Sequence, residues 1–139
     1  MKILIFGAKG LIGRSLFFQF KEQGYKVKGT IRNKEDMKFF NSQTSEDLVI
    51  TGDVNCDSNI IDLISNFKPD LIINCLGITK HVSEIYNSHQ LIGINSQFPH
   101  FLSNHADLLG FRLINFSTDC IFSGKRGNYK ESDLSDAED

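Results

Sequence analysis

Residues 3–13 read Ile-Leu-Ile-Phe-Gly-Ala-Lys-Gly-Leu-Ile-Gly, an apolar run followed by three evenly spaced glycines. The continuous apolar residues 3–6 predict a buried strand. After the glycines, apolar residues recur at four-residue spacing, at Ile12, Leu16 and Phe20. This period predicts an amphipathic helix, and Gly24 is a suitable residue to end it. The stretch therefore predicts a strand, a glycine loop and a helix in direct succession.

The spacing of these glycines indicates an anion site. Gly-x-x-Gly-x-x-Gly between a strand and a helix lets the backbone turn tightly and approach a phosphate, and the positive helix end favours the charge. A tight turn that uses glycine only for its conformation would look the same. Because a strand and a helix flank the loop, we favour a dinucleotide whose pyrophosphate lies against Gly7, Lys9, Gly10, Leu11, Ile12 and Gly13.

Further apolar runs alternate with helical patterns along the whole chain. Strands are expected at residues 3–6, 25–31, 48–50, 71–73 and 112–116. Between them we expect a short helix capped by Asn33, a helix capped by Asp57, and at least one long helix within residues 82–109, bent near Pro99. Such alternation predicts an α/β fold of Rossmann type, a doubly wound parallel sheet in three layers. Right-handed crossovers give the strand order 3-2-1-4-5 in one domain over residues 1–139.

Composition narrows the functional class. The chain has 139 residues, 40% of them hydrophobic, and a net charge of −2, which gives no electrostatic case for nucleic acid or an anionic membrane. No apolar run is long enough for a membrane span or a signal peptide. Three widely spaced cysteines predict free thiols and a cytoplasmic protein. The four histidines lack metal-ligand spacing with the cysteines, so we expect no metal site.

The end of the second expected strand bears on the choice of cofactor. Residues 29–33 read Gly-Thr-Ile-Arg-Asn, without the acidic residue that binds the ribose 2′-hydroxyl of NAD. Arg32 can hold a 2′-phosphate, which favours NADP(H) over NAD(H). The alternative is a solvated arginine at a helix start, an unfavourable place for a cation. Asp53 and Val54 follow the third strand. They could contact the adenine, or Asp53 could simply cap the turn.

Six segments in order resemble the extended short-chain dehydrogenase/reductase family, in its dTDP-4-dehydrorhamnose reductase-like branch. The glycine loop is weak by itself, but the series spans nearly the whole chain. The segments are Gly-Ala-Lys-Gly-Leu-Ile-Gly (7–13), Gly-Asp-Val (52–54), Lys-Pro-Asp-Leu-Ile-Ile-Asn-Cys-Leu-Gly (68–77), Ile-Asn-Ser-Gln-Phe-Pro-His (94–100), Ser-Thr-Asp-Cys-Ile-Phe-Ser-Gly (117–124) and Tyr-Lys-Glu-Ser-Asp (129–133).

The resemblance implies roles for individual residues. Thr118 matches the catalytic hydroxyl that binds the substrate carbonyl, a role that the residues alone would not favour over satisfying loop backbone. Asn95 matches an asparagine that supports the central helix near the site. Cys120 stands where this branch often has tyrosine. The residues implied to lie beside the cofactor are Cys75, Leu76, Gly77, Phe116 and Ser117.

One catalytic motif of this family is missing from the sequence. The family's Tyr-x-x-x-Lys pair, which protonates the developing alkoxide, has no match after Thr118, because Asp133 stands four residues after Tyr129. The family's sugar-nucleotide-binding portion is missing as well. We therefore expect a C-terminally incomplete, N-terminal part of a reductase that transfers hydride from NADPH to a 4-keto-deoxysugar nucleotide. Alone, it should bind cofactor weakly, if at all, and not turn over.

Two alternatives stay open at this point. The same branch includes a regulatory protein of methionine adenosyltransferase, so a non-catalytic dinucleotide-binding subunit is one. A sugar-nucleotide epimerase or dehydratase is the other, since it would share every residue visible here. Dimers in the family often use helices at or beyond this end of the chain, which makes a homodimer a further expectation.

Overall fold

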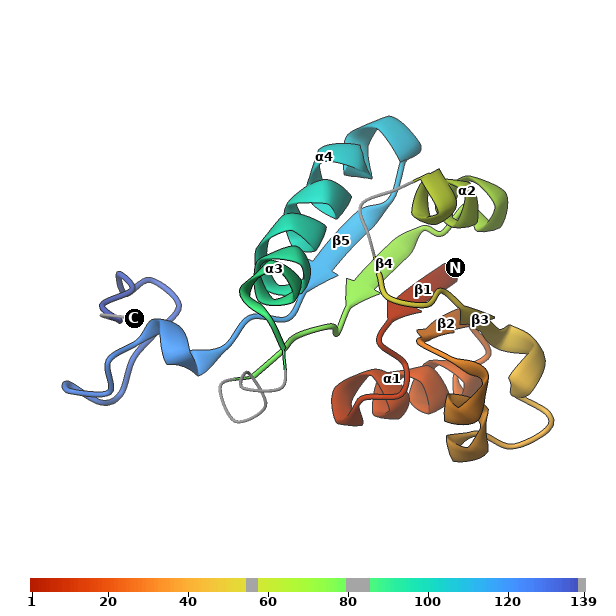
Figure 1. Cartoon of the computed structure of the whole chain (residues 1–139), viewed down its shortest axis with the longest axis horizontal. Coiled ribbons are helices and arrows are strands. Elements are labelled where there is room, and N and C mark those ends of the chain that lie inside the picture. Colours follow the sequence, from red (N-terminus) through yellow and green to blue (C-terminus); the bar gives the residue numbers. More distant parts are fainter. Residues whose placement is uncertain (55–57, 80–85, 138–139) are drawn as a thin grey trace.

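The fold is built on a sheet of five parallel strands. The computed structural model describes residues 1–54, 58–79 and 86–137. The strand order is β3-β2-β1-β4-β5, which confirms the predicted order and the doubly wound topology (Figure 1). Each predicted strand exists, and its ends lie within one residue of the expected ones. The strands are β1 (Lys2–Phe6), β2 (Lys26–Ile31), β3 (Leu48–Ile50), β4 (Leu71–Asn74) and β5 (Arg112–Asn115).

Helices connect the strands and cover the sheet. The α-helices are α1 (Leu11–Glu22), α2 (Ser58–Phe67), α3 (Ser88–Ile92) and α4 (Phe98–Leu109). Shorter helical turns are η1 (Lys34–Phe39), η2 (Ser45–Asp47), η4 (Gly93–Gln97) and η5 (Asp119–Ile121). As predicted, α1 stops at Gly24, whose positive φ of 80° suits a residue without a side chain. Asn33 precedes η1 as expected, but that helix is of the 3-10 type.

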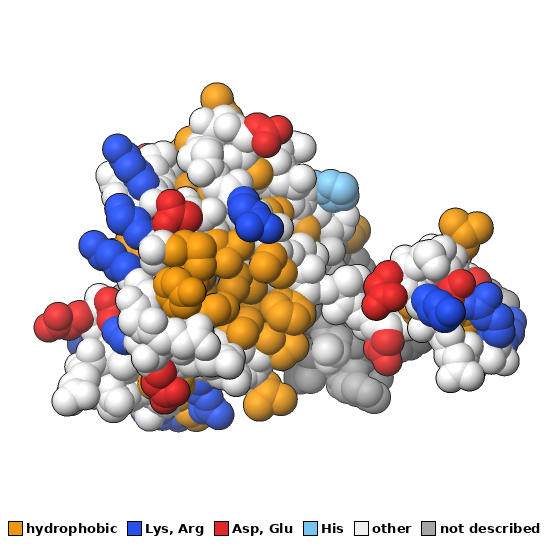
Figure 2. All heavy atoms as spheres, turned by 180° about the vertical axis from the view of Figure 1, so that it is seen from behind, with side chains coloured by type: hydrophobic (Ala, Val, Ile, Leu, Met, Phe, Trp, Pro, Cys, Tyr) orange, Lys and Arg blue, Asp and Glu red, His pale blue; other side chains and the backbone are white. Residues whose placement is uncertain are grey.

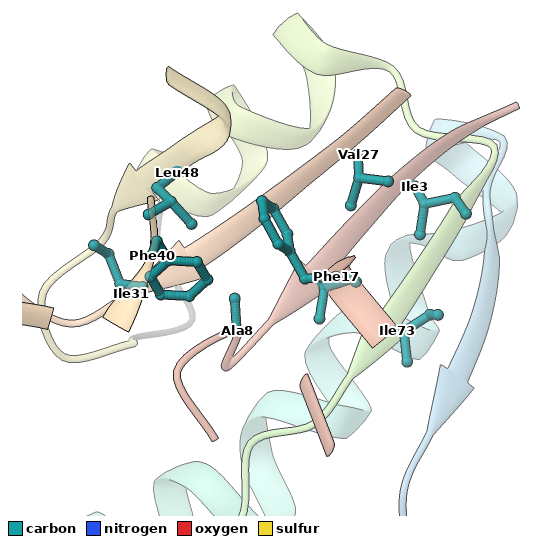
Figure 3. Close-up of a cluster of buried hydrophobic side chains, with 9 residues drawn as sticks. Ile3, Ala8, Phe17, Val27, Ile31, Phe40, Leu48 and Ile73 are labelled. Carbon is teal, nitrogen blue, oxygen red and sulfur yellow. The ribbon is translucent and has the colours of Figure 1, made fainter. Parts of the chain in front are cut away.

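Alternate residues of β1 enter two separate hydrophobic clusters, one on each face of the sheet. Ile3 and Ile5 join the cluster that α1 covers, where Phe17 is fully buried (Figure 3). Leu4 and Phe6 join the cluster formed with α2 and α4. Since successive side chains of a strand point to opposite faces, a continuous apolar strand requires cover on both sides. The layers therefore follow directly from the run at residues 3–6.

The helix expected within residues 82–109 differs from its prediction. Residues 80–85 and the expected cap Asp57 lie outside the described residues. From Ser88 to Leu109 the chain is helical throughout, but α3 and α4 are joined by the π-helical turn η4. The expected irregularity thus lies before Pro99, which is in the first turn of α4. Because a proline has no amide to donate to the preceding helical turn, its position directly after η4 is consistent with the irregular hydrogen bonding there.

The two faces of β5 are covered unequally. Leu113 packs against the cluster under α4. Ile114, the register partner of the buried Ile73, lies on the opposite face and is 45% exposed. Seen from behind, the molecule has one broad area where hydrophobic side chains gather (Figure 2). Among the described residues, helix α1 packs against β1 and β2 on the face that carries Ile73, whereas α4, the helix that contacts β5, lies on the opposite face with Leu113.

Candidate functional site

The glycine loop between β1 and α1 is fixed to the end of β2. Gly7 has a φ of +80°, so the tight turn predicted there requires a glycine. Its amide donates to Thr30 Oγ1 at 3.1 Å, and the amide of Ala8 donates to the Thr30 carbonyl at 2.9 Å. The amide of Gly10 then closes the turn on the Gly7 carbonyl at 3.0 Å. The loop is therefore held in one shape by backbone bonds.

Gly13 lets the first turn of α1 lie directly against this loop. A Cβ atom at Gly13 would stand 2.2 Å from the Gly7 carbonyl oxygen, which leaves no room for any side chain. The close neighbour of Gly13 is thus the loop and not the sheet. Gly29 of β2 lets the helix approach the sheet, because a Cβ there would lie 2.7 Å from Ala8 Cβ and 2.9 Å from the ring of Phe17. A role for Gly29 was not predicted from the sequence.

The N-terminus of α1 is suited to an anion. Gly10 is its N-cap, no side chain caps it, and its first turn contains no acidic residue. The first amides of a helix have no partner within it, and no acidic residue of this first turn neutralises the positive helix end. The side chains of Leu11 and Ile12 are 83% and 47% exposed. Their predicted role at the pyrophosphate would therefore be carried by their amides, and it stays a prediction.

A cavity of about 360 Å³ opens beside the loop, at the carboxyl ends of the central strands. Ligands of doubly wound folds bind at this edge, where the strand order reverses. Glycines without space-filling side chains form one wall, so the cavity fits a bound dinucleotide. The predicted cofactor residues that line it are Gly7, Lys9, Gly10, Arg32, Val54, Cys75, Leu76 and Gly77. Leu11, Ile12, Gly13 and Asp53 were also predicted and do not line it.

Two ion pairs place charges at the cavity. Lys9 Nζ lies 2.7 Å from Asp36 Oδ1, and Arg32 Nε lies 3.0 Å from Asp53 Oδ1. Asp36 is buried and lines the same cavity as Lys9 and Arg32. Burial opposes its ionisation, but the Lys9 ammonium and the backbone amides of Asn33 and Arg32 outweigh burial and lower the pKa of Asp36. An acidic group is thus present near the end of β2, where none was predicted.

A network of amide side chains positions the loop after β4. Asn74 is fully buried; its Nδ2 donates to Asn115 Oδ1 at 2.7 Å, and its Oδ1 accepts from the Leu76 amide at 3.2 Å. Asn95 of η4 bonds both backbone groups of Ile78, at 2.8 and 2.9 Å. The supporting role implied for Asn95 is thus exerted on this loop, which η4 holds against the cavity. The Asn74–Asn115 pair was not predicted.

A second cavity of about 880 Å³ adjoins the first along the ends of β4 and β5. The two cavities share Leu76, Gly77 and Ile94 as lining residues. Phe116, Ser117 and Thr118, the remaining predicted site residues, all line the second one. A ligand with two linked parts could therefore occupy both cavities.

Among the polar residues that line this second cavity, Thr118 has the side chain best suited to take part in a reaction. Its Oγ1 accepts from the Cys120 amide at 3.2 Å and donates to Asp119 Oδ1 at 3.5 Å. The hydroxyl therefore does satisfy loop backbone as an acceptor, as the simpler interpretation expected. Because the bond to Asp119 is long, the hydroxyl can exchange it for a bond to a ligand oxygen. Such a donor can stabilise negative charge that develops on a carbonyl oxygen.

Cys75, at the wall of the first cavity, has a partly buried thiol. Desolvation raises the pKa of Cys75 from 9.0 to about 11. The thiolate is the nucleophile, and its lower population at Cys75 is offset in part by the greater reactivity of a more basic thiolate. We therefore expect iodoacetamide at pH 8 to alkylate Cys75 about tenfold more slowly than the exposed Cys120. The alkylation rate of Cys75 should continue to rise with pH until the pH approaches 11. Time-resolved peptide mass spectrometry measures this, with the exposed Cys120 as the internal comparison; equal rates at the two residues would refute it.

The described ranges, residues 1–54, 58–79 and 86–137, contain neither a candidate metal cluster nor a helix that could span a membrane. No group of three or more histidine, cysteine or acidic residues there could hold a metal ion. None of the helices in those ranges has the length and hydrophobicity to cross a membrane.

Comparison with known proteins relates the whole described fold to one family. The family model described as "RmlD substrate binding domain" matches residues 1–137. The dTDP-4-dehydrorhamnose reductase of Aggregatibacter actinomycetemcomitans is 28% identical over 135 residues, which are 96% of this chain and 40% of that protein. Methionine adenosyltransferase 2 subunit beta of Bos taurus is 26% identical over 137 residues, covering 96% and 37% of the two chains.

A solved structure supports the same relationship. The structure of a hypothetical dTDP-4-dehydrorhamnose reductase from Sulfolobus tokodaii superposes with a TM-score of 0.77 at 25% identity. The superposition covers 99% of this chain and 46% of the other. The chain spans about two fifths of the length of the curated relatives that it matches.

Proposed function

The chain belongs to the RmlD substrate binding domain family, and from this premise we propose that it is the cofactor-binding part of a sugar-nucleotide reductase. In the whole protein, hydride from NADPH would reduce the keto carbon of a 4-keto-deoxysugar nucleotide. The relatives support an oxidoreductase of sugar-nucleotide metabolism, since they include dTDP-4-dehydrorhamnose reductases. The finer choice of cofactor and reaction is our proposal.

One observation carries this proposal: the two cavities adjoin, and each contains its own set of predicted residues. The first has the glycine loop and the unneutralised end of α1 for a pyrophosphate. The second has the Thr118 hydroxyl for a substrate carbonyl. Leu76 and Gly77 line both, so a cofactor and a substrate could meet beside them.

Within this site each residue has a proposed task. Gly7 makes the tight turn, Gly10 leaves room for the pyrophosphate, and Gly13 lets α1 pack on the loop. The amides of Leu11 and Ile12 donate to the pyrophosphate. Val54 and Asp53 lie at the adenine end, while Cys75, Leu76, Gly77 and Phe116 exclude water from the nicotinamide end. Thr118 donates its hydroxyl proton in a hydrogen bond to the substrate carbonyl oxygen, and Ser117 flanks it.

We propose NADP(H) rather than NAD(H) as the cofactor. Arg32 and Lys9 both line the first cavity near the end of β2, where the adenosine ribose of a dinucleotide lies in such folds. The Arg32 guanidinium can form two parallel hydrogen bonds to a phosphate. Its ion pair with Asp53 is mostly exposed and can be exchanged for a phosphate at little cost.

The 139-residue chain alone is proposed to bind cofactor weakly and to have no turnover. The sequence lacks a Tyr-x-x-x-Lys pair after Thr118. Loss of general acid catalysis costs about 10²–10⁴ in rate, and loss of substrate positioning costs more. The relatives are more than twice as long as this chain, which is consistent with the missing groups lying in further sequence.

The decisive assay follows NADPH absorbance at 340 nm with a dTDP-4-keto-6-deoxysugar, for the 139-residue chain and for the full-length protein in parallel. We expect oxidation of NADPH by the full-length protein and none by the 139-residue chain. Turnover by the short chain would disprove its inactivity, whereas a full-length protein that binds dinucleotide but reduces no keto sugar would disprove the reductase.

A second candidate is a non-catalytic regulatory subunit, favoured by the similarity to methionine adenosyltransferase 2 subunit beta. Such a protein would keep the first cavity and its dinucleotide while the Thr118 hydroxyl had no catalytic task. The same assay separates the candidates, because a regulatory subunit would bind dinucleotide and remain inactive at any chain length. An epimerase or dehydratase would instead convert its sugar nucleotide without net consumption of NADPH.

A further inference from the structure

A buried carboxylate faces the cation of the glycine loop. Asp36, in η1, is 4% exposed, and its Oδ1 lies 2.7 Å from the ammonium of Lys9. Both residues line the first cavity, together with Arg32. The loop after β1 and the helical turn after β2 are thus joined by an ion pair at the point where an adenosine ribose would lie.

The two partners of this pair differ in how deeply their side chains are buried. The second oxygen of Asp36 accepts from the amide of Asn33 at 3.4 Å, so the carboxylate is held by its own helical turn. The Lys9 side chain is 51% exposed and contacts the face of Phe39, with its ammonium 5.5 Å from the ring centroid. Removing Lys9 from Asp36 would leave a buried charge without its partner, which is costly. Lys9 is therefore retained by Asp36.

Arg32 is in the opposite situation. Its partner Asp53 is 64% exposed, and the Arg32 side chain is 47% exposed. Ion pairs between exposed groups contribute little because water and salt screen them. Arg32 can therefore leave Asp53 for a phosphate, and Asp53 then remains solvated.

We propose that Asp36 sets the cofactor selectivity of this site, because it neutralises Lys9 and leaves Arg32 to supply the contact with a 2′-phosphate. This inference rests on the proposed function, in which the first cavity binds NADP(H). In the native protein the preference for the phosphorylated cofactor is then modest. The Asp36 carboxylate also repels a nearby phosphate, whereas it is compatible with a free 2′-hydroxyl. Asp36 is thus a positioning residue for Lys9 and a specificity determinant for the cofactor.

The test is the selectivity ratio, the Kd for NADH divided by the Kd for NADPH, measured by NMR titration of the 139-residue chain. In Asp36→Asn the amide oxygen can still accept from Asn33, while Lys9 becomes free to bind phosphate. We expect the ratio to rise about tenfold, the usual worth of one charge-assisted hydrogen bond. Asp47→Asn is the matched control: it removes the carboxylate that pairs with Lys21, which lines neither cavity, and should leave the ratio unchanged.

Lys9→Gln completes the cycle and does not depend on how Asp36→Asn folds. Alone, it leaves the Asp36 carboxylate unpaired and repelling the phosphate, so the ratio should fall, but by less than in Arg32→Ala, which removes the phosphate contact itself. In the Asp36→Asn background it should remove the whole gain. A ratio unchanged by Asp36→Asn, or a Lys9→Gln loss as large as that of Arg32→Ala, overturns the inference. The proposed function fails separately: the wild-type chain would then bind neither cofactor, or Arg32→Ala would leave the NADPH preference intact.

Discussion

Replacement of Gly13 by alanine is expected to lower the free energy of unfolding by about 3–5 kcal/mol, at the upper end of single-residue effects. The added Cβ would lie 2.2 Å from the Gly7 carbonyl oxygen and 2.9 Å from its carbon, and these are backbone atoms of a loop fixed by three hydrogen bonds. To relieve the overlap, α1 must move away from the loop. The same movement would displace the amides proposed to hold the pyrophosphate, so dinucleotide binding should be lost too.

Thermal unfolding followed by circular dichroism measures this effect. For a domain of this size, 1 kcal/mol of stability corresponds to about 3–5 °C in Tm. The Tm of the Gly13→Ala protein should therefore lie below that of the wild type by about 10 °C or more. Gly93→Ala is the control, because Gly93 has helical dihedral angles and its nearest neighbour is a side-chain atom at 4.0 Å. Alanine there should be neutral or stabilising by up to about 1 kcal/mol. A Gly13→Ala protein as stable as the Gly93→Ala protein would contradict the packing argument.

Replacement of Thr118 by valine in the full-length protein is expected to lower kcat by about 10²–10³, the usual cost of removing one donor to a developing oxyanion. Valine keeps the shape of threonine but cannot donate to the substrate carbonyl. It also removes the acceptor for the Cys120 amide, although this exposed bond contributes little to stability. The dissociation constant for NADPH should stay within a factor of about two, since Thr118 lines only the second cavity.

Thr118→Ser tests the role of the hydroxyl apart from that of the threonine methyl group. Serine keeps the donor and the bond to Cys120, so we expect most of the activity to return. Steady-state kinetics on both variants, with the NADPH affinity measured separately, decides the role. Equal activity in Thr118→Val and the wild type would assign the hydroxyl to the loop turn alone.

The sheet order could be predicted because local patterns determine it. The apolar run at residues 3–6 must be buried on both faces, and the right-handed crossover rule then leaves few topologies. Gly7 and Gly24 could be identified as turn residues because their positive φ angles require glycine. Eight of the predicted cofactor residues reach the first cavity for the same reason: in a parallel sheet, the residues that follow the strands meet at one edge.

Other features depend on contacts between distant segments. The pairing of Asp36 with Lys9 arises only when η1 folds back over the glycine loop. The only sequence signal for Asp36 was its place as an acidic residue a few positions after the second strand. Asn74 and Asn115 are register partners on the adjacent parallel strands β4 and β5, so their contact could have been predicted once the register was known. The π-helical turn before Pro99 has no local sequence pattern that we can identify.

Whether the glycine loop and its cavity bind a nicotinamide dinucleotide can be tested by following the amide chemical shifts of the ¹⁵N-labelled 139-residue chain during titration with NADPH. We expect saturable shifts, even at weak affinity, at the amides of Gly10, Leu11, Ile12 and Gly77. Gly110, at the far end of α4, should not shift. Saturable binding that leaves the Gly10–Ile12 amides unchanged would show that the dinucleotide binds elsewhere. No binding by either this chain or the full-length protein up to millimolar NADPH and NADH would show that the loop binds no dinucleotide.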